Sequence, residues 1–361
     1  MKLPKPNKIQ AEEYLPFTKF LQKKLIKTKL SSNESALGPS PRAKKEYNKV
    51  SKNFKRYPDN YGFFLKRVLS RNFKLDPSRI ILGAGSDQIF ELICKLFLKK
   101  NDEVIIPKNS FIIYRIYSKI NGAKVVYAKE KNYTVSVDEI LSNVTKKTKI
   151  VFLANPNNPT GTYINKNNLI KLRKKLRNNI LLVIDDAYSE YVNKKDYLSG
   201  LELFSKSKNV FVTRTFSKAY GLAGLRVGWG YASKEIINNI NKIKPPFNVS
   251  RPALSAAAAS INDKVWLKKE LKHVRKWSKI FFKIFKEINI ETNETTGNFL
   301  LMNFDRVKTS SNIVFKALIK SGILVRKMNN YKIKNSLRVT IGNASENKKF
   351  ISVLKRLFNV W

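Results

Sequence analysis

Short runs of almost wholly apolar residues recur along the first two thirds of the chain, with room for a helix between most of them. Seven of these runs predict strands, at residues 79–83, 103–107, 123–127, 149–153, 180–184, 210–212 and 225–229. Strands as continuously apolar as these are typical of a mostly parallel sheet that helices cover on both faces. The pattern therefore predicts an α/β fold built on a mostly parallel seven-stranded sheet.

The pattern changes after the double proline Pro245-Pro246. It predicts an alanine-rich helix over 253–261 and then a long amphipathic helix, whose apolar face comprises Leu267, Leu271, Val274, Trp277, Phe281, Phe285 and Ile288. Apolar runs at 297–301, 322–326 and 337–341 predict short strands, so the remainder reads as a smaller α+β domain. We predict an N-terminal arm over 1–45 that joins this small domain, a large domain over 46–246, and the small domain over 247–361. A short helix is also predicted over 17–25.

Polar residues follow several of the predicted strands. They lie at 85–87, at Asn158, at 185–188 and at 215–218. In open α/β sheets ligands bind beyond the carboxyl ends of the strands. Small residues at a strand-to-helix junction, as at 85–87, also let backbone N–H groups point at an anion. The sequence therefore predicts a binding site at this edge of the sheet.

The stretch 212–230 carries the most informative chemistry. Lys218 lies among hydroxyl-bearing and small residues, and Arg226 follows eight positions later. Lysine can form an imine with an aldehyde cofactor. The planar guanidinium of arginine suits a phosphate better than an ammonium group does. This stretch indicates an anion site that contains a reactive amine.

The formal net charge of +45, from 71 Lys and Arg against 26 Asp and Glu, raises a basic nucleic-acid-binding protein as an alternative of another class. The basic residues, however, are spread over the chain and recur on solvated helix faces, as at 169–176. No nucleic-acid-binding motif accompanies them. Compositional bias is therefore the preferred interpretation, and we expect no specific nucleic-acid partner.

The small numbers of cysteine and histidine residues, and the short length of the apolar runs, exclude other classes of protein. A single cysteine, Cys94, and a single histidine, His273, leave no cluster for a zinc site and no intrachain disulfide. Cys94 lies in an apolar helical run and is interpreted as a core residue. No apolar run approaches the roughly 20 residues of a membrane span. We expect a cytoplasmic enzyme that binds no metal and no membrane.

Three motifs occur together in this chain: Asn158-Pro159-Thr160-Gly161, Asp185-Asp186-Ala187-Tyr188, and Ser217-Lys218 with Arg226. With them the chain, from about Ser32 to Gly342, resembles the fold-type-I aminotransferases that depend on pyridoxal 5'-phosphate (PLP), and most closely the histidinol-phosphate aminotransferases. The resemblance implies PLP as cofactor and a homodimer. It also implies a reaction of histidinol phosphate with 2-oxoglutarate that gives imidazole acetol phosphate and glutamate, a step of histidine biosynthesis.

The resemblance assigns the catalytic roles to Lys218, Asp185 and Tyr188. Lys218 would hold PLP as an imine and then move a proton between the substrate carbon and the cofactor carbon. Asp185 would pair with the protonated pyridine nitrogen and so keep the ring able to accept electrons. Asn158 and Tyr188 would hydrogen-bond the phenolic oxygen of the ring.

The resemblance also assigns the remaining cofactor contacts. The residues that would bind the PLP phosphate are Gly85, Ser86 and Asp87 through their backbone, Thr215 and Ser217 through their hydroxyls, and Arg226 through its guanidinium. Tyr114 is similar to the aromatic residue that stacks on the ring. Tyr57 is similar to a tyrosine that reaches the phosphate from the neighbouring subunit.

Four residues resemble the substrate contacts of the family. Arg338 would bind the α-carboxylate, Arg326 would bind the substrate phosphate, and Asn33 with Glu34 would help to recognise the substrate. The chain departs from the family pattern in having Ser35-Ala36 where Asn-Pro is usual, and Asp186 where glutamate is usual. An aromatic-amino-acid aminotransferase, an amino-acid-phosphate decarboxylase and a regulatory protein of the same fold without turnover remain as alternatives.

Overall fold

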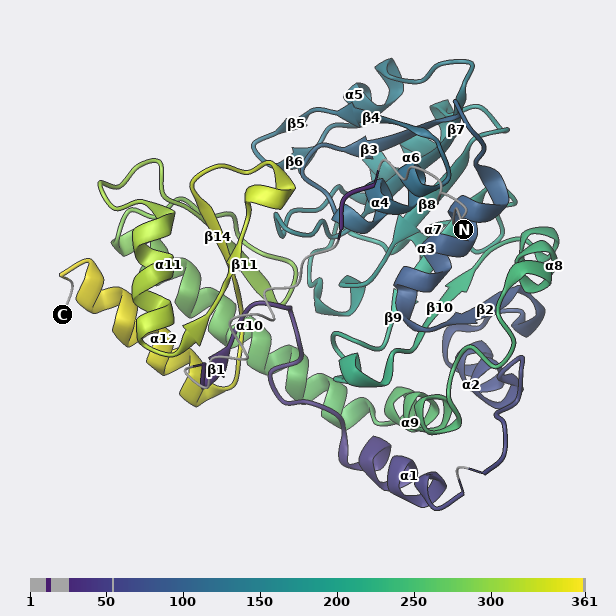
Figure 1. The fold of residues 1–361 in the computed structure, drawn as a ribbon, viewed down its shortest axis with the longest axis horizontal. Coiled ribbons are helices and arrows are strands. Elements are labelled where there is room, and N and C mark those ends of the chain that lie inside the picture. The colour runs from purple at the N-terminus through teal and green to yellow at the C-terminus, as the bar shows by residue number, and fades with distance from the viewer. Residues whose placement is uncertain (1–10, 14–25, 54, 360–361) are drawn as a thin grey trace, which may run out of the picture.

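The computed structural model describes residues 11–13, 26–53 and 55–359, so the helix predicted over 17–25 lies outside the described residues. A seven-stranded sheet with the order β2-β10-β9-β8-β7-β3-β4 forms the centre of the larger part of the molecule (Figure 1). Its strands are β2 (Ile80–Gly83), β3 (Glu103–Pro107), β4 (Lys124–Ala128), β7 (Thr148–Ala154), β8 (Leu181–Asp185), β9 (Val210–Thr215) and β10 (Gly228–Tyr231). Neighbouring strands from β9 to β4 run parallel, which confirms the predicted α/β class.

Strand β10 runs antiparallel to both of its neighbours, β2 and β9. The connection from β9 holds only a short 3₁₀ helix, η4 (Ala223–Leu225), whereas a parallel return needs a longer crossover, usually a full helix. The strand also begins three residues later than predicted, since Leu225 belongs to η4 and Arg226 ends it in a left-handed conformation. This leaves the Arg226 side chain on the loop that faces the carboxyl ends of the parallel strands.

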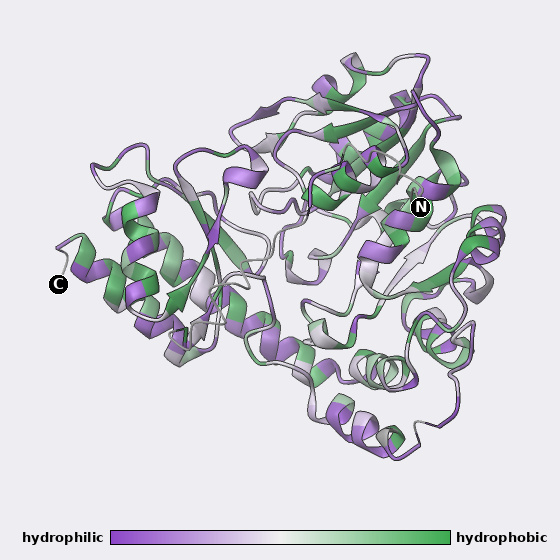
Figure 2. Cartoon of the chain, viewed as in Figure 1, coloured by the Kyte–Doolittle hydropathy of each residue, from purple (hydrophilic) through white to green (hydrophobic). Residues whose placement is uncertain are grey.

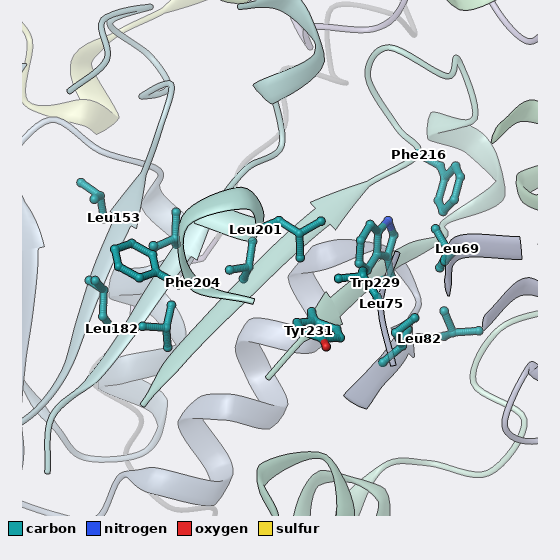
Figure 3. Packing of buried hydrophobic residues seen from close by; sticks show 14 of the residues in the cluster. Leu69, Leu75, Leu82, Leu153, Leu182, Leu201, Phe204, Phe216, Trp229 and Tyr231 are labelled. Carbon is teal, nitrogen blue, oxygen red and sulfur yellow. The ribbon is translucent and has the colours of Figure 1, made fainter. Parts of the chain in front are cut away.

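Helices cover both faces of the sheet because its side chains alternate between two apolar clusters. One cluster joins strand residues such as Leu82, Leu153 and Leu182 to helices on one face, and Figure 3 shows part of it. The other joins Val104, Phe152 and their neighbours to helices on the opposite face. The helices of this part are α1 (Pro41–Ser51), α2 (Phe63–Phe73), α3 (Gly85–Phe97), α4 (Ile112–Ile120), α5 (Val137–Ser142), α6 (Lys166–Lys175), α7 (Gly200–Phe204), α8 (Lys234–Ile243) and α9 (Arg251–Asn262).

The smaller part is built on a three-stranded antiparallel sheet of β11 (Phe299–Asn303), β14 (Ser336–Thr340) and β13 (Arg326–Lys327). The long helix α10 (Lys264–Glu287) packs here with α11 (Ser311–Lys320) and α12 (Ala344–Leu357), and it extends towards α9 (Figure 1). Strand β1 (Thr28–Lys29) pairs with β12 (Ile323–Leu324), so the segment before α1 packs against this part. The limits predicted for the three domains at residues 45 and 246 stay predictions.

Hydrophobic residues concentrate in the strands and on the inward faces of the helices, and hydrophilic residues lie on the outward faces (Figure 2). Cys94 is buried in one of the apolar clusters, where burial raises the pKa of its thiol to about 12. Among the described residues, no helix combines the length and the apolar character that crossing a membrane requires. The remaining short elements are β5 (Glu130–Lys131), β6 (Thr134–Val135), η2 (Pro77–Arg79), η3 (Ser189–Tyr191) and η5 (Asn329–Tyr331).

Candidate active site

A cavity of about 230 Å³ opens where the carboxyl ends of β7, β8 and β9 meet the smaller part of the molecule. It brings together side chains that lie far apart in the sequence. The predicted site residues that line it are Asn33, Glu34, Ser86, Asp87, Asn158, Asp185, Tyr188, Thr215, Ser217, Lys218, Arg226, Arg326 and Arg338. Gly85 lies next to them at the start of α3, whereas Tyr57 and Tyr114 do not line the cavity.

One wall of the cavity is suited to a phosphate. The first turn of α3 directs the backbone N–H groups that follow Gly85 towards it, and Gly85 has the positive φ of 77° that this turn needs. Arg226 lies against this turn, with Nη1 3.3 Å from Ser217 Oγ and Nη2 3.2 Å from Asp87 Oδ2. The Ser217 amide donates to Thr215 Oγ1 at 3.1 Å. A guanidinium, two hydroxyls and a helix N-terminus thus converge on one place.

The amine of Lys218 lies three residues beyond the end of β9 and faces the same cavity. Its Nζ donates a hydrogen bond to the Ser32 carbonyl oxygen at 3.1 Å and lies 5.9 Å from the centre of the Tyr188 ring. The lysine is therefore held at the junction of the two parts of the molecule, beside the phosphate wall. This is the place where an aldehyde anchored by its phosphate could react with an amine.

The Asp185 carboxylate ends β8 and is held by three donors. Oδ2 accepts a 2.5 Å hydrogen bond from the Tyr114 hydroxyl, and Oδ1 accepts from the Thr213 hydroxyl and the Ala187 amide, each at 3.2 Å. Burial raises the pKa of Asp185 to about 6, and the bonds from Tyr114 and Thr213 oppose that shift. A fixed, buried carboxylate of this kind suits a protonated ring nitrogen.

Two polar groups of the predicted set lie between Asp185 and the smaller part of the molecule. The Tyr188 hydroxyl accepts a hydrogen bond from Asn33 Nδ2 at 2.9 Å. Asn158 Oδ1 accepts one from Arg338 Nη1 at 2.5 Å. Asn33 and Arg338 belong to the smaller part, so these bonds join the two halves of the site.

Two buried arginines form the wall on the side of the small sheet. Arg326 and Arg338 are paired residues on the neighbouring strands β13 and β14, and each is about 5% exposed or less. Arg338 Nη2 donates to the Ser31 carbonyl at 2.9 Å, but no acceptor among the described residues lies within reach of its Nε. Two buried guanidinium groups on paired residues of neighbouring strands are suited to bind an anion.

The asparagine and glutamate of the N-terminal motif enter the cavity from a loop of the smaller part. Asn33 has a positive φ of 55°, and its backbone N–H donates a hydrogen bond to Thr340 Oγ1 at 2.9 Å. Glu34 is half-buried and forms an ion pair of 2.5 Å with Lys29. The loop therefore presents a carboxylate to the cavity beside the two arginines.

The structure does not place Tyr114 at the cavity, where its predicted stacking role would need it. Its side chain is completely buried beneath the cavity and stacks on Phe152, with ring centres 4.9 Å apart and planes 2° apart. Phe111, three residues earlier, lines the cavity instead, and the sequence reasoning missed it. Phe111 and Tyr114 lie one helical turn apart near the start of α4. Phe111 is nearer to the end of β3, where the site was expected, and was therefore the better candidate.

Tyr57 lies outside the cavity of its own chain. It is 80% exposed and stacks on Phe247, with ring centres 4.6 Å apart. Its predicted contact with the phosphate of a second subunit remains a prediction. The other cavity residues that the sequence reasoning missed are Ser31, Ser32, Ala154, Ala187, Ala223 and Tyr331. The first five are small residues without a distinctive sequence signal.

Asp186, where the family usually has glutamate, does not line the cavity. Its buried carboxylate accepts hydrogen bonds from the amides of Gly200 at 3.2 Å and Leu201 at 3.3 Å. It also lies 4.0 Å from the guanidinium of Arg214, and burial raises its pKa to about 7. The departure at this position therefore affects a buried structural contact.

Comparison with known proteins places these features in a family. Residues 26–354 match the model of the family described as aminotransferase class I and II. The histidinol-phosphate aminotransferase of Pelagibacter ubique is 51% identical over 99% of this chain and 100% of its own length. That of Rhodopseudomonas palustris (strain BisB18) is 41% identical over 90% of each chain.

Solved structures give the same picture of the fold. A crystal structure of histidinol-phosphate aminotransferase from Sinorhizobium meliloti in complex with pyridoxal-5'-phosphate superimposes with a TM-score of 0.89, covering 97% of this chain and 96% of that one at 23% identity. The enzyme from Clostridium acetobutylicum gives a TM-score of 0.85 over 92% of this chain and 99% of that one, at 26% identity.

Proposed function

The chain belongs to the class I and II aminotransferases, which depend on PLP, and from that premise we propose that it transfers an amino group between histidinol phosphate and 2-oxoglutarate. The products would be imidazole acetol phosphate and glutamate, and the reaction would serve histidine biosynthesis. The names of the relatives, at up to 51% identity over nearly the whole chain, support this choice of substrate. We also propose that the enzyme acts in the cytoplasm.

The observation that carries the proposal is the pair of buried arginines, Arg326 and Arg338, on the wall opposite the phosphate cradle. Arg226 and the start of α3 are suited to the phosphate of the cofactor, so an anionic group of the substrate needs other donors. We assign the substrate phosphate to Arg326 and the α-carboxylate of glutamate to Arg338. The phosphate of one substrate and the α-carboxylate of the other would then bind at the same wall of the cavity in turn, as the two half-reactions follow each other.

When bound, PLP supplies an aldehyde that takes up the amino group and a ring that accepts electrons from the substrate carbon. In this proposal the amides after Gly85, the hydroxyls of Thr215 and Ser217, and the Arg226 guanidinium hold its phosphate. Asp185 keeps a proton on the ring nitrogen, and Asn158 and Tyr188 hydrogen-bond the phenolic oxygen. Lys218 Nζ carries the proton that moves between the substrate carbon and the cofactor carbon.

We further propose that the active form is a homodimer in which Tyr57 reaches the phosphate of the partner's cofactor. Tyr57 is 80% exposed, and Phe63 and Phe64, each 59% exposed, lie near it in the sequence. An apolar groove of about 370 Å³ runs between α1 and the loop after Lys218. The exposed aromatic side chains and the apolar groove each support an interface, because monomeric proteins rarely expose large apolar patches.

Single half-reactions test the substrate. The cofactor absorbance is followed after adding histidinol phosphate, histidinol, phenylalanine or threonine phosphate, and we expect histidinol phosphate to react fastest. In Arg326→Met the preference for histidinol phosphate over histidinol should fall by about 100-fold, since charge-assisted hydrogen bonds are lost. Arg306→Met is the matched control, because Arg306 is an exposed arginine of the same part of the molecule.

Other outcomes would point to the alternatives. A faster reaction with phenylalanine would indicate an aromatic-amino-acid aminotransferase, and release of CO₂ from threonine phosphate would indicate a decarboxylase. The variant Lys218→Ala should lose both turnover and the absorbance of the lysine-bound cofactor. If it kept both, the assignment of the cofactor site to this cavity would be wrong.

A further inference from the structure

Tyr114 occupies a position whose geometry serves a purpose other than stacking on the cofactor. Its ring is completely buried on α4, stacked on Phe152 and packed edge-on against Phe90 and Phe111, with ring centres 5.0 and 5.6 Å away. A phenol hydroxyl in such apolar surroundings is unfavourable unless it forms a hydrogen bond. The hydroxyl of Tyr114 donates to Asp185 Oδ2 at 2.5 Å.

The Asp185 carboxylate takes its orientation from donors on three elements. Tyr114 of α4 binds one oxygen, while Thr213 of β9 and the Ala187 amide, just beyond β8, bind the other. With both oxygens engaged, the carboxylate cannot rotate freely. Asp185 also lines the cavity in which the cofactor site lies, so its orientation decides which oxygen meets the ring nitrogen.

We propose that Tyr114 is a positioning residue: its hydroxyl orients the Asp185 carboxylate so that it can bind the protonated ring nitrogen of PLP. The hydroxyl contributes a short hydrogen bond to a charged acceptor at a buried position, where such a bond is strong. The stacked rings of Tyr114 and Phe152 hold that hydroxyl in place. This role of Tyr114 concerns only the binding of PLP, so it does not depend on which substrate the enzyme uses.

The surroundings of Asp185 raise the pKa of its carboxyl, and the hydrogen bond from the Tyr114 hydroxyl opposes that rise. Burial raises the pKa of Asp185 to about 6, and the neighbouring carboxyl of Asp87 on α3 acts in the same direction. Asp186, the next residue, interacts electrostatically with Asp185 and with Arg214 of β9. Tyr188 and Lys218 line the same cavity as Asp185. The Tyr114 hydrogen bond is the largest influence that lowers the pKa of Asp185. Removing it should therefore raise that pKa further.

The test is the pH dependence of PLP binding to the apoenzyme, measured by absorbance or fluorescence titration between about pH 5.5 and 8.5. In Tyr114→Phe we expect the Kd for PLP near neutral pH to rise about tenfold, and the midpoint of its pH dependence to move up by about one unit. Tyr117→Phe is the matched control, since Tyr117 lies on the same helix, is half-buried and does not touch Asp185. It should bind PLP as the unmodified enzyme does.

A second variant keeps the test decisive if Tyr114→Phe does not fold. Thr213→Val removes a donor to the other oxygen of Asp185 and should move the pH midpoint in the same direction by less. If Tyr114→Phe folds, by circular dichroism of the apoenzyme, but leaves the Kd and its pH midpoint unchanged, the hydroxyl has only a packing role and the proposal is wrong. Should Tyr114→Phe fail to fold, an unchanged midpoint in Thr213→Val would overturn it. Normal PLP binding without any reaction of histidinol phosphate would instead overturn the proposed substrate alone.

Discussion

The approach of Arg226 to the start of α3 depends on a single glycine. Gly85 has a φ of +77°, and a Cβ at this position would lie 2.4 Å from Arg226 Nη2. No side chain fits there without displacing the guanidinium from the place where it converges with Ser217 and Asp87. The glycine therefore serves two purposes, because it allows both the left-handed backbone and the close contact.

At this residue scale we predict that Gly85→Ala lowers the affinity for PLP at least about tenfold, since the displaced arginine loses charge-assisted hydrogen bonds to the phosphate. Gly38→Ala is the matched control, because Gly38 has a similar φ of +70° but no atom within 4 Å of the added Cβ. Both variants carry the same kind of backbone strain. PLP titration of the two apoenzymes separates the effects: an equal loss in both would assign it to strain and not to Arg226.

The helix α10 connects the substrate loop to the rest of the molecule. Its residue Glu270 is completely buried, and its two carboxylate oxygens accept hydrogen bonds from the amides of Ala36 at 3.2 Å and Leu37 at 3.0 Å. The Tyr191 hydroxyl is 3.4 Å from the same carboxylate. The loop that these bonds hold carries Ser32, Asn33 and Glu34 into the cavity. One helix thus sets the position of the loop.

At this element scale we predict that Glu270→Gln raises the KM for the amino donor about tenfold, because an amide nitrogen now faces one of the loop N–H groups. The affinity for PLP should change much less, since the residues assigned to its phosphate lie outside this loop and the loop reaches the cofactor residues only through Lys218 and Tyr188. Glu287→Gln, at the exposed end of α10, is the control. Steady-state kinetics and PLP titration check the pair of expectations, and a parallel loss of PLP affinity in Glu270→Gln would contradict them.

The surface of the whole molecule combines a net charge of +45 with exposed aromatic side chains at Tyr57, Tyr61, Phe63, Phe64 and Phe247. Like charges oppose the association of two copies of this chain, whereas burial of aromatic surface favours it. Tyr57 and Tyr61 lie between α1 and α2, Phe63 and Phe64 begin α2, and Phe247 lies between α8 and α9. In the single chain the side chain of Tyr57 is 80% exposed. An interface formed by these residues would bury it.

At this molecular scale we predict a dimer whose mass by light scattering is near twice the 41.6 kDa of one chain. Tyr57→Ala and Lys218→Ala, each impaired alone, should complement each other when co-expressed. If Tyr57 crosses the interface, each hybrid dimer has one site with both residues intact, so random mixing restores roughly a quarter of the full activity. Activity no higher than that of the Tyr57→Ala enzyme by itself would show that Tyr57 serves its own chain or none.

Much of the fold was predictable because its determinants are local. Continuous apolar runs marked the sheet strands to within about three residues, and the amphipathic stripe of α10 marked that helix almost to its ends. The gathering of Lys218, Asp185 and Asn158 was predictable as well. It follows from a general rule: residues just beyond the carboxyl ends of parallel strands must meet at one edge.

The sequence by itself determined the fold class, the cofactor and the residues that the strand ends present to it, since each depends on a short stretch of chain. Tertiary structure alone decided the antiparallel course of β10, the position of Phe111 and not Tyr114 at the cavity, and the buried anchor at Glu270. These features depend on the direction in which a side chain points and on which distant segment it meets. Such contacts form only when helices and strands pack, and no local pattern records them.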